Sequence, residues 1–278
     1  MTDGRTAPMT EVILEPGRVD RNYWRDLWRY RELFQVLAWR DVAIRYKQTA
    51  IGVAWAVIRP ALTVLIFTVV FGRIAHLPSD GVPYPLLVFA GILPWTFFAT
   101  ALSDAAGSLV SNANLIGKVY FPRLIVPAAT VVAAFIDFLI SLALMAALMV
   151  WYRFAPDWRI IFLPLFAVLA VLASLGPGLW ITAVNVRYRD FRYVIPFLVQ
   201  FGLYVSPVGF SSSVVPGPWR LVYALNPMVG VIDGFRWCLL GTPIDWRAVG
   251  VSLLVVAAML WIGVGQFRRL EKTFADVL

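Results

Sequence analysis

The chain has 278 residues, of which 60% are hydrophobic and 14% are charged, and its mean hydropathy is +0.77. Soluble domains carry roughly a quarter of charged residues, so this composition excludes an ordinary soluble protein and indicates an integral membrane protein with several helices. A separate large soluble domain does not fit in the remaining length. The single cysteine, Cys238, excludes an internal disulfide, and the single histidine, His76, argues against a histidine-based metal site.

The N-terminal part changes character near residue 23. Residues 1–22 mix Pro, Gly, Thr and charges without periodicity, which predicts a flexible cytoplasmic tail. Residues 23–48 instead predict an amphipathic helix lying in the membrane interface, with its polar face toward the cytoplasm. A solvated helix of a small soluble domain is the alternative. The apolar residues at helical spacing are Leu33, Val36, Leu37 and Ile44, and the tryptophans are Trp24, Trp28 and Trp39.

Six apolar runs have the length of about 20 residues or more that a membrane-spanning helix needs. They lie at about 51–73, 85–109, 124–151, 160–184, 194–210 and 248–267. The fifth run is the shortest, and prolines flank it. The stretch Ser211–Trp246 is rich in Pro, Gly and aromatic residues, and its apolar pieces are too short to span, which predicts short re-entrant or interfacial helices. The sequence therefore predicts an all-α membrane protein with six spans, whose transmembrane domain covers residues 49–278.

The basic residues are distributed unevenly between the two sides of these spans. With both termini in the cytoplasm, 18 of the 24 lysines and arginines fall on the cytoplasmic side. This bias follows the positive-inside rule and predicts cytoplasmic termini. The same rule accounts for the net charge of +8, so the charge requires no nucleic-acid partner.

The first long cytoplasmic connection, Ser111–Pro127, is rich in amide, basic and aromatic residues. Asn112 and Asn114 are predicted helix caps, because their side chains can accept from free backbone N–H groups. Pro122 interrupts any continuous helix. We interpret the segment as a docking surface for a cytoplasmic partner, and its candidate docking residues are Asn112, Asn114, Lys118, Tyr120, Phe121 and Arg123.

The second connection, Asn185–Pro196, is again short, basic and aromatic and ends at a proline. Two such loops on one face suit a single cytoplasmic partner with an acidic or grooved surface. Ordinary positive-inside anchors, with aromatic residues at the headgroups, are the alternative. The candidate docking residues of this loop are Arg187, Tyr188, Arg189 and Asp190.

Four long blocks carry a resemblance to a known family. The run Phe89–Pro127 resembles the signature region of the permease subunits of bacterial polysaccharide exporters of the ABC-2 type, which export O-antigen, capsule or teichoic acid. The blocks Arg45–Gly72, Asn185–Phe210 and Leu225–Gly241 resemble the same family in the same order. The resemblance therefore covers nearly all of the chain after about residue 25.

This resemblance implies a half-transporter that moves a lipid-linked polysaccharide from the cytoplasmic to the outer side of the bacterial inner membrane. It implies a homodimer paired with two copies of a separate cytoplasmic ATPase, with the two basic loops as coupling elements and residues 23–48 as the interface helix. The chain would then be no enzyme and hold no cofactor, and ATP and Mg would bind the partner. The sequence is consistent with a separate ATPase, since it contains no G-x-x-x-x-G-K-[ST] phosphate loop.

Two ionisable residues are singled out within predicted spans, where charge is costly and usually functional. Arg59 lies about eight residues into the first span, and Asp137 about thirteen into the third. Their similar depth suggests the hypothesis that they pair, within a subunit or across a dimer. The alternative is that Arg59 extends to the interface while Asp137 bonds to a hydroxyl or water.

A sugar conduit needs aromatic faces for stacking and amides or hydroxyls for hydrogen bonds. Aromatic residues also form interfacial belts and pack helices, which is the alternative reading for each of them. The candidate channel lining is Trp95, Phe98, Gln200, Tyr204 and Ser206, and the candidate outer gate is Arg220, Asp233 and Arg236.

Three other functions are open at this stage. The first is an ABC-2 exporter of a drug or small lipid, which the block around Asn112–Arg123 argues against. The second is a membrane-embedded enzyme acting on lipid-linked sugars, but the carboxylates in the loops are scattered rather than clustered. The third is a passive channel, which would leave the two patterned loops unexplained.

Overall fold

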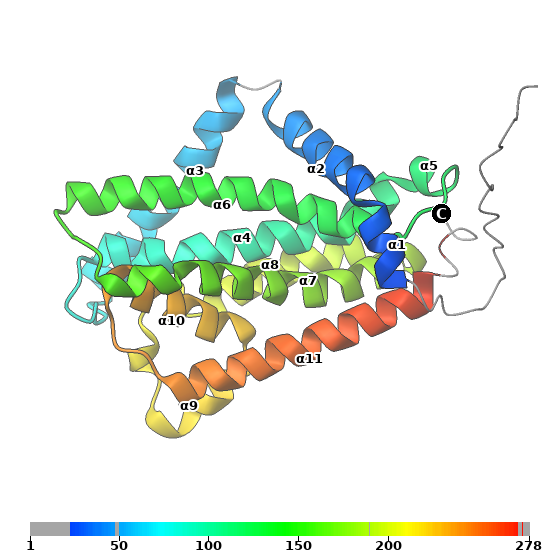
Figure 1. Cartoon of the computed structure of the whole chain (residues 1–278). Coiled ribbons are helices and arrows are strands. Elements are labelled where there is room, and N and C mark those ends of the chain that lie inside the picture. The colour runs from blue at the N-terminus through cyan, green and yellow to red at the C-terminus, as the bar shows by residue number, and fades with distance from the viewer. Residues whose placement is uncertain (1–22, 48–49, 189, 272–273, 275–278) are drawn as a thin grey trace, which may run out of the picture.

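The computed structural model describes residues 23–47, 50–188, 190–271 and 274, with side chains for all of them except 50–56. The predicted tail 1–22 and Arg189 lie outside the described residues. All the regular secondary structure in the described part of the chain is helical (Figure 1). Its helices are α1 (Tyr23–Arg29), α2 (Arg31–Tyr46), α3 (Ala50–Phe67), η1 (Thr68–Ile74), α4 (Tyr84–Ser111), α5 (Ala113–Ile116), α6 (Ile125–Trp151), η2 (Trp158–Phe162), α7 (Leu163–Arg187), α8 (Phe191–Val205), η3 (Ser212–Val214), α9 (Gly217–Tyr223), α10 (Pro227–Leu240) and α11 (Trp246–Leu270).

The helix α4 is the centre of the bundle. It packs against α6, α7 and α10, and α11 packs on the other side of α7. Figure 1 shows α4, α6 and α7 running side by side, with α11 beyond α7 and inclined to all three. Most of α4 is buried, including Leu86, Leu87, Leu93 and Leu109, which are all fully inaccessible. Movement of α4 would therefore be transmitted to most of the molecule.

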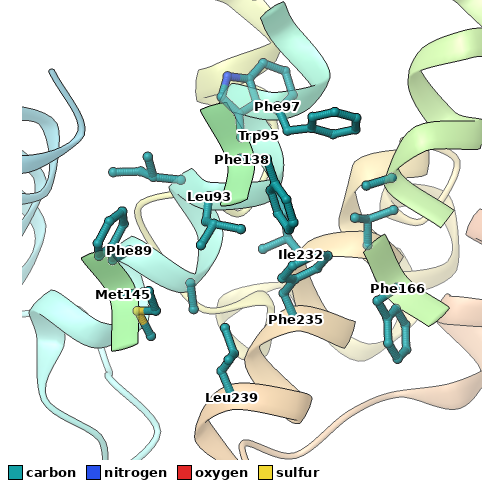
Figure 2. Close-up of a cluster of buried hydrophobic side chains, with 14 of the residues drawn as sticks. Phe89, Leu93, Trp95, Phe97, Phe138, Met145, Phe166, Ile232, Phe235 and Leu239 are labelled. Atoms are coloured by element: carbon teal, nitrogen blue, oxygen red, sulfur yellow. The ribbon is translucent and has the colours of Figure 1, made fainter. Parts of the chain in front are cut away.

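Aromatic side chains from several helices fill the core (Figure 2). Phe97 of α4 packs edge-on against Phe138 of α6 at 5.6 Å between ring centroids, and Phe138 packs against Phe235 of α10 at 5.8 Å. The helices α7 and α11 approach closely at two glycines. A Cβ atom on Gly263 would lie 2.1 Å from the carbonyl oxygen of Gly176, so only glycine allows this contact.

Five helical segments in the described part are long and apolar enough to cross a membrane. They are Val57–Ile74, Tyr84–Ser111, Ile125–Trp151, Trp158–Arg187 and Trp246–Leu270. These correspond to the first, second, third, fourth and sixth predicted spans. The chain is therefore an all-α membrane protein that crosses the bilayer several times.

The fifth predicted span, 194–210, has different boundaries. Its helix, α8, begins at Phe191 and ends at Val205. Pro207 explains the early end, because the residue before a proline avoids the helical region, and Ser206 is extended at φ −89° and ψ 153°. At 15 residues α8 is about 22 Å long, which is shorter than the roughly 30 Å of a bilayer core.

The predicted single helix 23–48 is divided in two. The break is at Tyr30, whose φ of −89° and ψ of 20° separate α1 from α2. The residues of the predicted apolar stripe also differ in burial. Leu37 is buried against the bundle, whereas Val36 and Ile44 are exposed, together with the three tryptophans.

The predicted re-entrant region contains η3, α9 and α10. The helix α10 begins with Asn226, whose side chain accepts from the backbone N–H of Met228, and with Pro227 in its first turn. It ends at Gly241, which takes the left-handed conformation with φ of 69°. Nearly all of α10 is buried against α4, α7 and α11, so this short helix belongs to the core.

Candidate functional site

The two predicted docking loops lie at the same end of the bundle, because both extend from the last turns of α4 and its neighbour α7. Asn185 near the end of α7 is buried, and its Nδ2 donates to the carbonyl of Ala106 at 2.8 Å. Thr182 donates to the carbonyl of Ala105 at 2.8 Å. The loop Ser111–Pro127 begins where α4 ends. One rigid helix therefore positions both loops.

The first loop has an exposed tip and a buried base. Lys118 and Tyr120 are exposed, whereas Phe121 is only 3% exposed and Pro122 is buried. Phe121 packs in a cluster with Tyr23, the C-terminal aromatic residues and the start of α6. Among the predicted docking residues, Lys118 and Tyr120 therefore lie on the exposed tip, while Phe121 anchors the loop.

The predicted cap role of the asparagines is wrong. Asn112 precedes α5, but its side chain makes no capping bond there; its Nδ2 donates back to the carbonyl of Ser108 at 2.8 Å. Asn112 thus hydrogen-bonds to a backbone carbonyl in the last turn of α4. Asn114 is an exposed residue inside α5.

Arg123 joins the first loop to the C-terminal segment. Its backbone N–H donates to Glu271 Oε1 at 2.6 Å, and its guanidinium donates to the backbone carbonyl of Glu271 and lies 5.9 Å from the ring of Phe274. Arg268 stacks over the ring of Tyr23 at 4.7 Å. Burial raises the pKa of the Glu271 carboxyl, although Arg123 and Arg268 oppose the shift. These five residues, which we call the terminal clasp, hold α1, the loop and the C-terminal segment together.

The second loop is exposed at its tip, although Asn185 at its start is buried. Arg187, Tyr188 and Asp190 are all accessible, and the guanidinium of Arg187 lies 5.6 Å from the ring of Tyr188. Arg189 lies outside the described residues. The loop therefore presents positive charge and aromatic surface at the same end of the bundle as the first loop.

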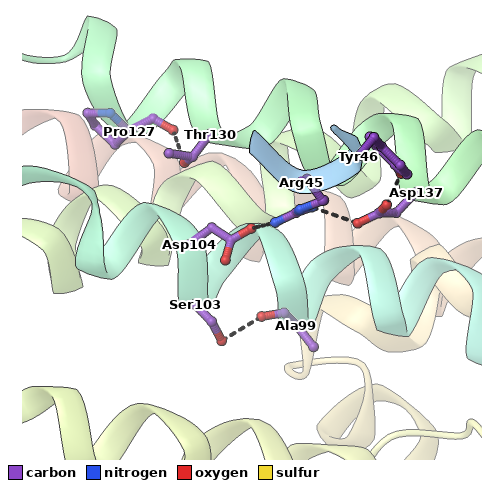
Figure 3. A network of polar contacts seen from close by, with 8 residues as sticks. All are labelled: Arg45, Tyr46, Ala99, Ser103, Asp104, Pro127, Thr130 and Asp137. Carbon is purple, nitrogen blue, oxygen red and sulfur yellow. Dashed lines mark hydrogen bonds and ion pairs between the residues drawn. The ribbon is translucent and has the colours of Figure 1, made fainter. Parts of the chain in front are cut away.

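A charged cluster lies between α2, α4 and α6 (Figure 3). The Nη1 of Arg45 is 2.6 Å from Asp137 Oδ2, and its Nη2 is 2.5 Å from Asp104 Oδ2. Tyr46 donates its hydroxyl hydrogen to the other oxygen of Asp137. The side chains of Arg45, Asp104 and Asp137 are 29–32% exposed. The cluster thereby fastens the end of α2 to the two helices that flank the first loop.

The arginine beside Asp137 is thus Arg45, and Arg59 is not the residue in this ion pair. The sequence places Arg45 within the predicted interfacial helix 23–48, and Asp104 was not among the predicted intramembrane polar residues. Asp104 lies inside the second predicted span, seven residues or about 10 Å from the end of α4. A carboxylate inside an apolar run was the available signal.

The predicted channel lining does not form one surface. Trp95 is 5% exposed and packs against Gly202 of α8, and Ser206 is fully buried and accepts from Asn226 Nδ2 at 2.9 Å. Phe98 is half-buried. Gln200 and Tyr204 are the members of this set that lie exposed.

Exposed aromatic residues instead follow one face of α8. They recur at spacings of four, four and three residues, which places them on a single helical stripe. Phe197 and Phe201 stack with ring centroids 6.2 Å apart and an interplanar angle of 14°. The residues of this aromatic stripe are Tyr193, Phe197, Phe201 and Tyr204.

The predicted outer-gate residues line a polar cavity of about 190 Å³ at the opposite end of the bundle. Asp233 accepts from the Ser212 hydroxyl at 2.5 Å, and Asp80 accepts from the hydroxyls of Ser211 and Ser213. Burial raises the pKa of Asp233 to about 6. The Tyr223 hydroxyl, which also borders the cavity, has no hydrogen-bond partner among the described residues.

The two arginines of this set have different positions. Arg236 is 2% exposed, and its three nitrogens donate to the carbonyls of Leu87, Val208 and Phe210 at 2.8–3.2 Å. It therefore fastens α10 to α4 and to the chain after α8. Arg220 is more accessible and donates to backbone carbonyls of residues 213 and 215.

This arrangement defines a multi-pass, all-α membrane protein with two basic loops presented from one end. The model of the ABC-2 type transporter family matches residues 32–240, which is most of the chain. The chain belongs to this family.

Three curated relatives are similar over most of their length. The O-antigen export system permease protein RfbA of Myxococcus xanthus is 26% identical over 256 residues, covering 91% of this chain and 97% of the relative. RfbA of Klebsiella pneumoniae is 22% identical over 248 residues, covering 89% and 95%. The polysialic acid transport protein KpsM of Escherichia coli is 26% identical over 247 residues, covering 86% and 93%.

Proposed function

We propose that this chain is the transmembrane subunit of an ATP-driven exporter that moves a lipid-linked polysaccharide from the cytoplasmic to the outer side of the bacterial inner membrane. The observation that carries this proposal is near-full-length similarity to permeases named for O-antigen export and polysialic acid transport. In this function the chain itself performs no covalent chemistry. Both termini and both basic loops face the cytoplasm, in agreement with the positive-inside bias.

The active unit in this proposal is a homodimer with two copies of a separate ATPase, which bind ATP and Mg. The exposed tips of the two loops, with Lys118, Tyr120 and Arg187, contact the ATPase. A force on either tip reaches α4, because Asn185 and Asn112 both bond to its last turns. The helices α1 and α2 act as the interface element, with their exposed tryptophans at the headgroups.

In the same proposal the cargo passes along α8, which provides the remaining crossing together with the chain after Ser206. The aromatic stripe of α8 offers flat faces for sugar rings, and Gln200 offers an amide beside it. The polar cavity around Asp233 lies at the outer end of this path, where α9 with Arg220 borders the gate.

The test is co-purification of the tagged full chain with its ATPase from detergent-solubilised membranes. Lys118→Glu and Arg187→Glu together should abolish co-purification, because they reverse the charge of both loop tips. Arg153→Glu is the matched control, since this exposed arginine lies at the opposite end of the bundle. Retention of the ATPase by the double variant would refute the assigned coupling surface. Absence of an ATPase with the native loops would refute the energy-coupled function.

A further inference from the structure

A second cavity, of about 570 Å³, opens between α3 with η1, α4 and α6. It lies at the end of the bundle far from the two basic loops, because it is lined by the start of α4 and the end of α6. Leu65, Val69, Phe89 and Leu148 form much of its wall. Its volume falls within the range of about 300–1,000 Å³ that is typical of small-molecule sites.

This second cavity is an open groove, and its walls are formed by membrane-spanning helices. Within the segment Val57–Ile74 only 6% of residues are buried, so the α3 side faces outward along most of its length. Leu65 and Val69 are exposed there. Hydrocarbon surrounds such a surface in a bilayer, so an acyl chain rather than water occupies an apolar groove at this depth.

The groove has a polar end that suits a phosphate. Arg73 lines it, is exposed, and has no hydrogen-bond or ion-pair partner among the described residues. Guanidinium groups bind phosphate oxygens with paired hydrogen bonds. Trp151 and Tyr152 line the groove at the end of α6, where the rings can lie at headgroup level.

The backbone beside Arg73 is also unusual. Thr68–Ile74 is a π-helical segment, a rare conformation that is often found at functional sites. Thr68 lines the cavity, and its hydroxyl is buried without a hydrogen-bond partner in the described part of the chain. A buried hydroxyl without a partner is costly, and rotation of the side chain toward the groove would let a lipid ester carbonyl accept its hydrogen bond.

We propose that this groove binds a resident anionic phospholipid, with its phosphate on Arg73, an ester carbonyl at Thr68 and an acyl chain along α3 and α6. The occupant is a bilayer lipid and not the transported cargo, because apart from Arg73, Thr68 and the two aromatic residues at the end of α6 the walls are apolar and offer few hydrogen-bonding groups for sugar hydroxyls. The inference requires only that these helices span the membrane, so it does not depend on the exported substrate.

The test is native mass spectrometry of the full chain, purified with its assembly and titrated with phosphatidylglycerol. Arg73→Gln should weaken binding about tenfold, as expected for the loss of one charge-assisted hydrogen bond, and Arg73→Lys should restore part of it. Ala147→Trp, which fills the groove from α6, should abolish binding. Arg247→Gln is the control, because Arg247 is an exposed arginine on α11 away from the groove. Circular dichroism and gel filtration verify folding, and Ala61→Phe, from the α3 wall, replaces Ala147→Trp if that variant fails to fold.

Three results would overturn the proposal. Equal lipid binding by the wild type and the groove variants would place the lipid elsewhere. A bound mass carrying saccharide units would identify the cargo as the occupant. Dissociation of a dimer by the groove-filling variant, without loss of lipid, would identify the groove as a subunit interface.

Discussion

Arg45 and Asp137 are 92 residues apart in the chain, yet their side chains form an ion pair with 2.6 Å between Nη1 and Oδ2. The second nitrogen of the same guanidinium binds Asp104. One arginine at the end of α2 thus bridges the helix that enters the first loop and the helix that leaves it. In the proposed transporter, this cluster couples the interface element to the spans.

Replacement of Arg45 should destabilise the protein more than its partial exposure alone would suggest. Arg45→Ala leaves two carboxylates close together without a cation, and we expect a loss of about 1–3 kcal/mol in unfolding free energy. The measurement is denaturant unfolding of the purified chain in detergent. Adding Asp104→Asn and Asp137→Asn to Arg45→Ala should recover part of this loss.

Double-mutant cycles at this cluster distinguish the two candidate partners of Asp137, which are Arg45 and Arg59. A double-mutant cycle between Arg45→Ala and Asp137→Asn should give a coupling energy of about 1–2 kcal/mol. The cycle between Arg59→Ala and Asp137→Asn should be additive within about 0.5 kcal/mol. The reverse pattern would restore the hypothesis drawn from the sequence.

The terminal clasp should control the order of the first loop. Glu271→Ala removes the carboxylate that accepts from the Arg123 backbone N–H, so amides of residues 117–123 should exchange hydrogen faster. Arg269→Ala is the control, because Arg269 is exposed on the same turn of α11. Hydrogen exchange followed by mass spectrometry measures the difference. Identical exchange in the two variants would contradict an anchoring role for Glu271.

The sequence predicts most of the fold because long apolar runs are a strong signal. The spans of α4, α6 and α11 begin and end within a few residues of their predicted limits. The early end of α8 at Val205 was also accessible in principle, through Pro207. The break at Tyr30 was not, because no glycine or proline marks it.

Residue partners were harder to predict than helices, because they depend on helix rotation and on distant chain segments. Phe121 and Tyr120 are adjacent aromatic residues, yet one is buried and the other is exposed. Arg236 was predicted as a gate residue from its place in the sequence, and the structure shows that it binds three backbone carbonyls. Nothing local to Arg236 indicates these acceptors, since they lie on α4 and after α8.

Asp233 should make stability depend on pH. Its folded pKa of about 6 lies above the unfolded value near 3.8, because burial favours the neutral acid. The contribution of the buried, neutral Asp233 carboxyl to the free energy of unfolding is therefore complete below about pH 4. It is lost as pH rises through 6. Asp233→Asn should remove this dependence and raise unfolding free energy at pH 8 by about 2–4 kcal/mol relative to wild type. Unfolding of both proteins between pH 4 and 8 tests this, and parallel profiles would contradict it.

The aromatic stripe of α8 should matter for transport more than for stability. Phe197 and Phe201 are 65% and 59% exposed and stack mainly on each other, so Phe197→Ala and Phe201→Ala should leave the unfolding midpoint nearly unchanged. The amount of polysaccharide on the cell surface should fall several-fold if these rings contact the sugars. Trp261→Ala is the matched control, because Trp261 is 80% exposed on α11, outside the proposed path. Surface polysaccharide is measured at equal membrane abundance of each variant. An equal loss in the Trp261 variant would show that exposed aromatic residues act through the bilayer, and wild-type export by the double α8 variant would remove the stripe from the path.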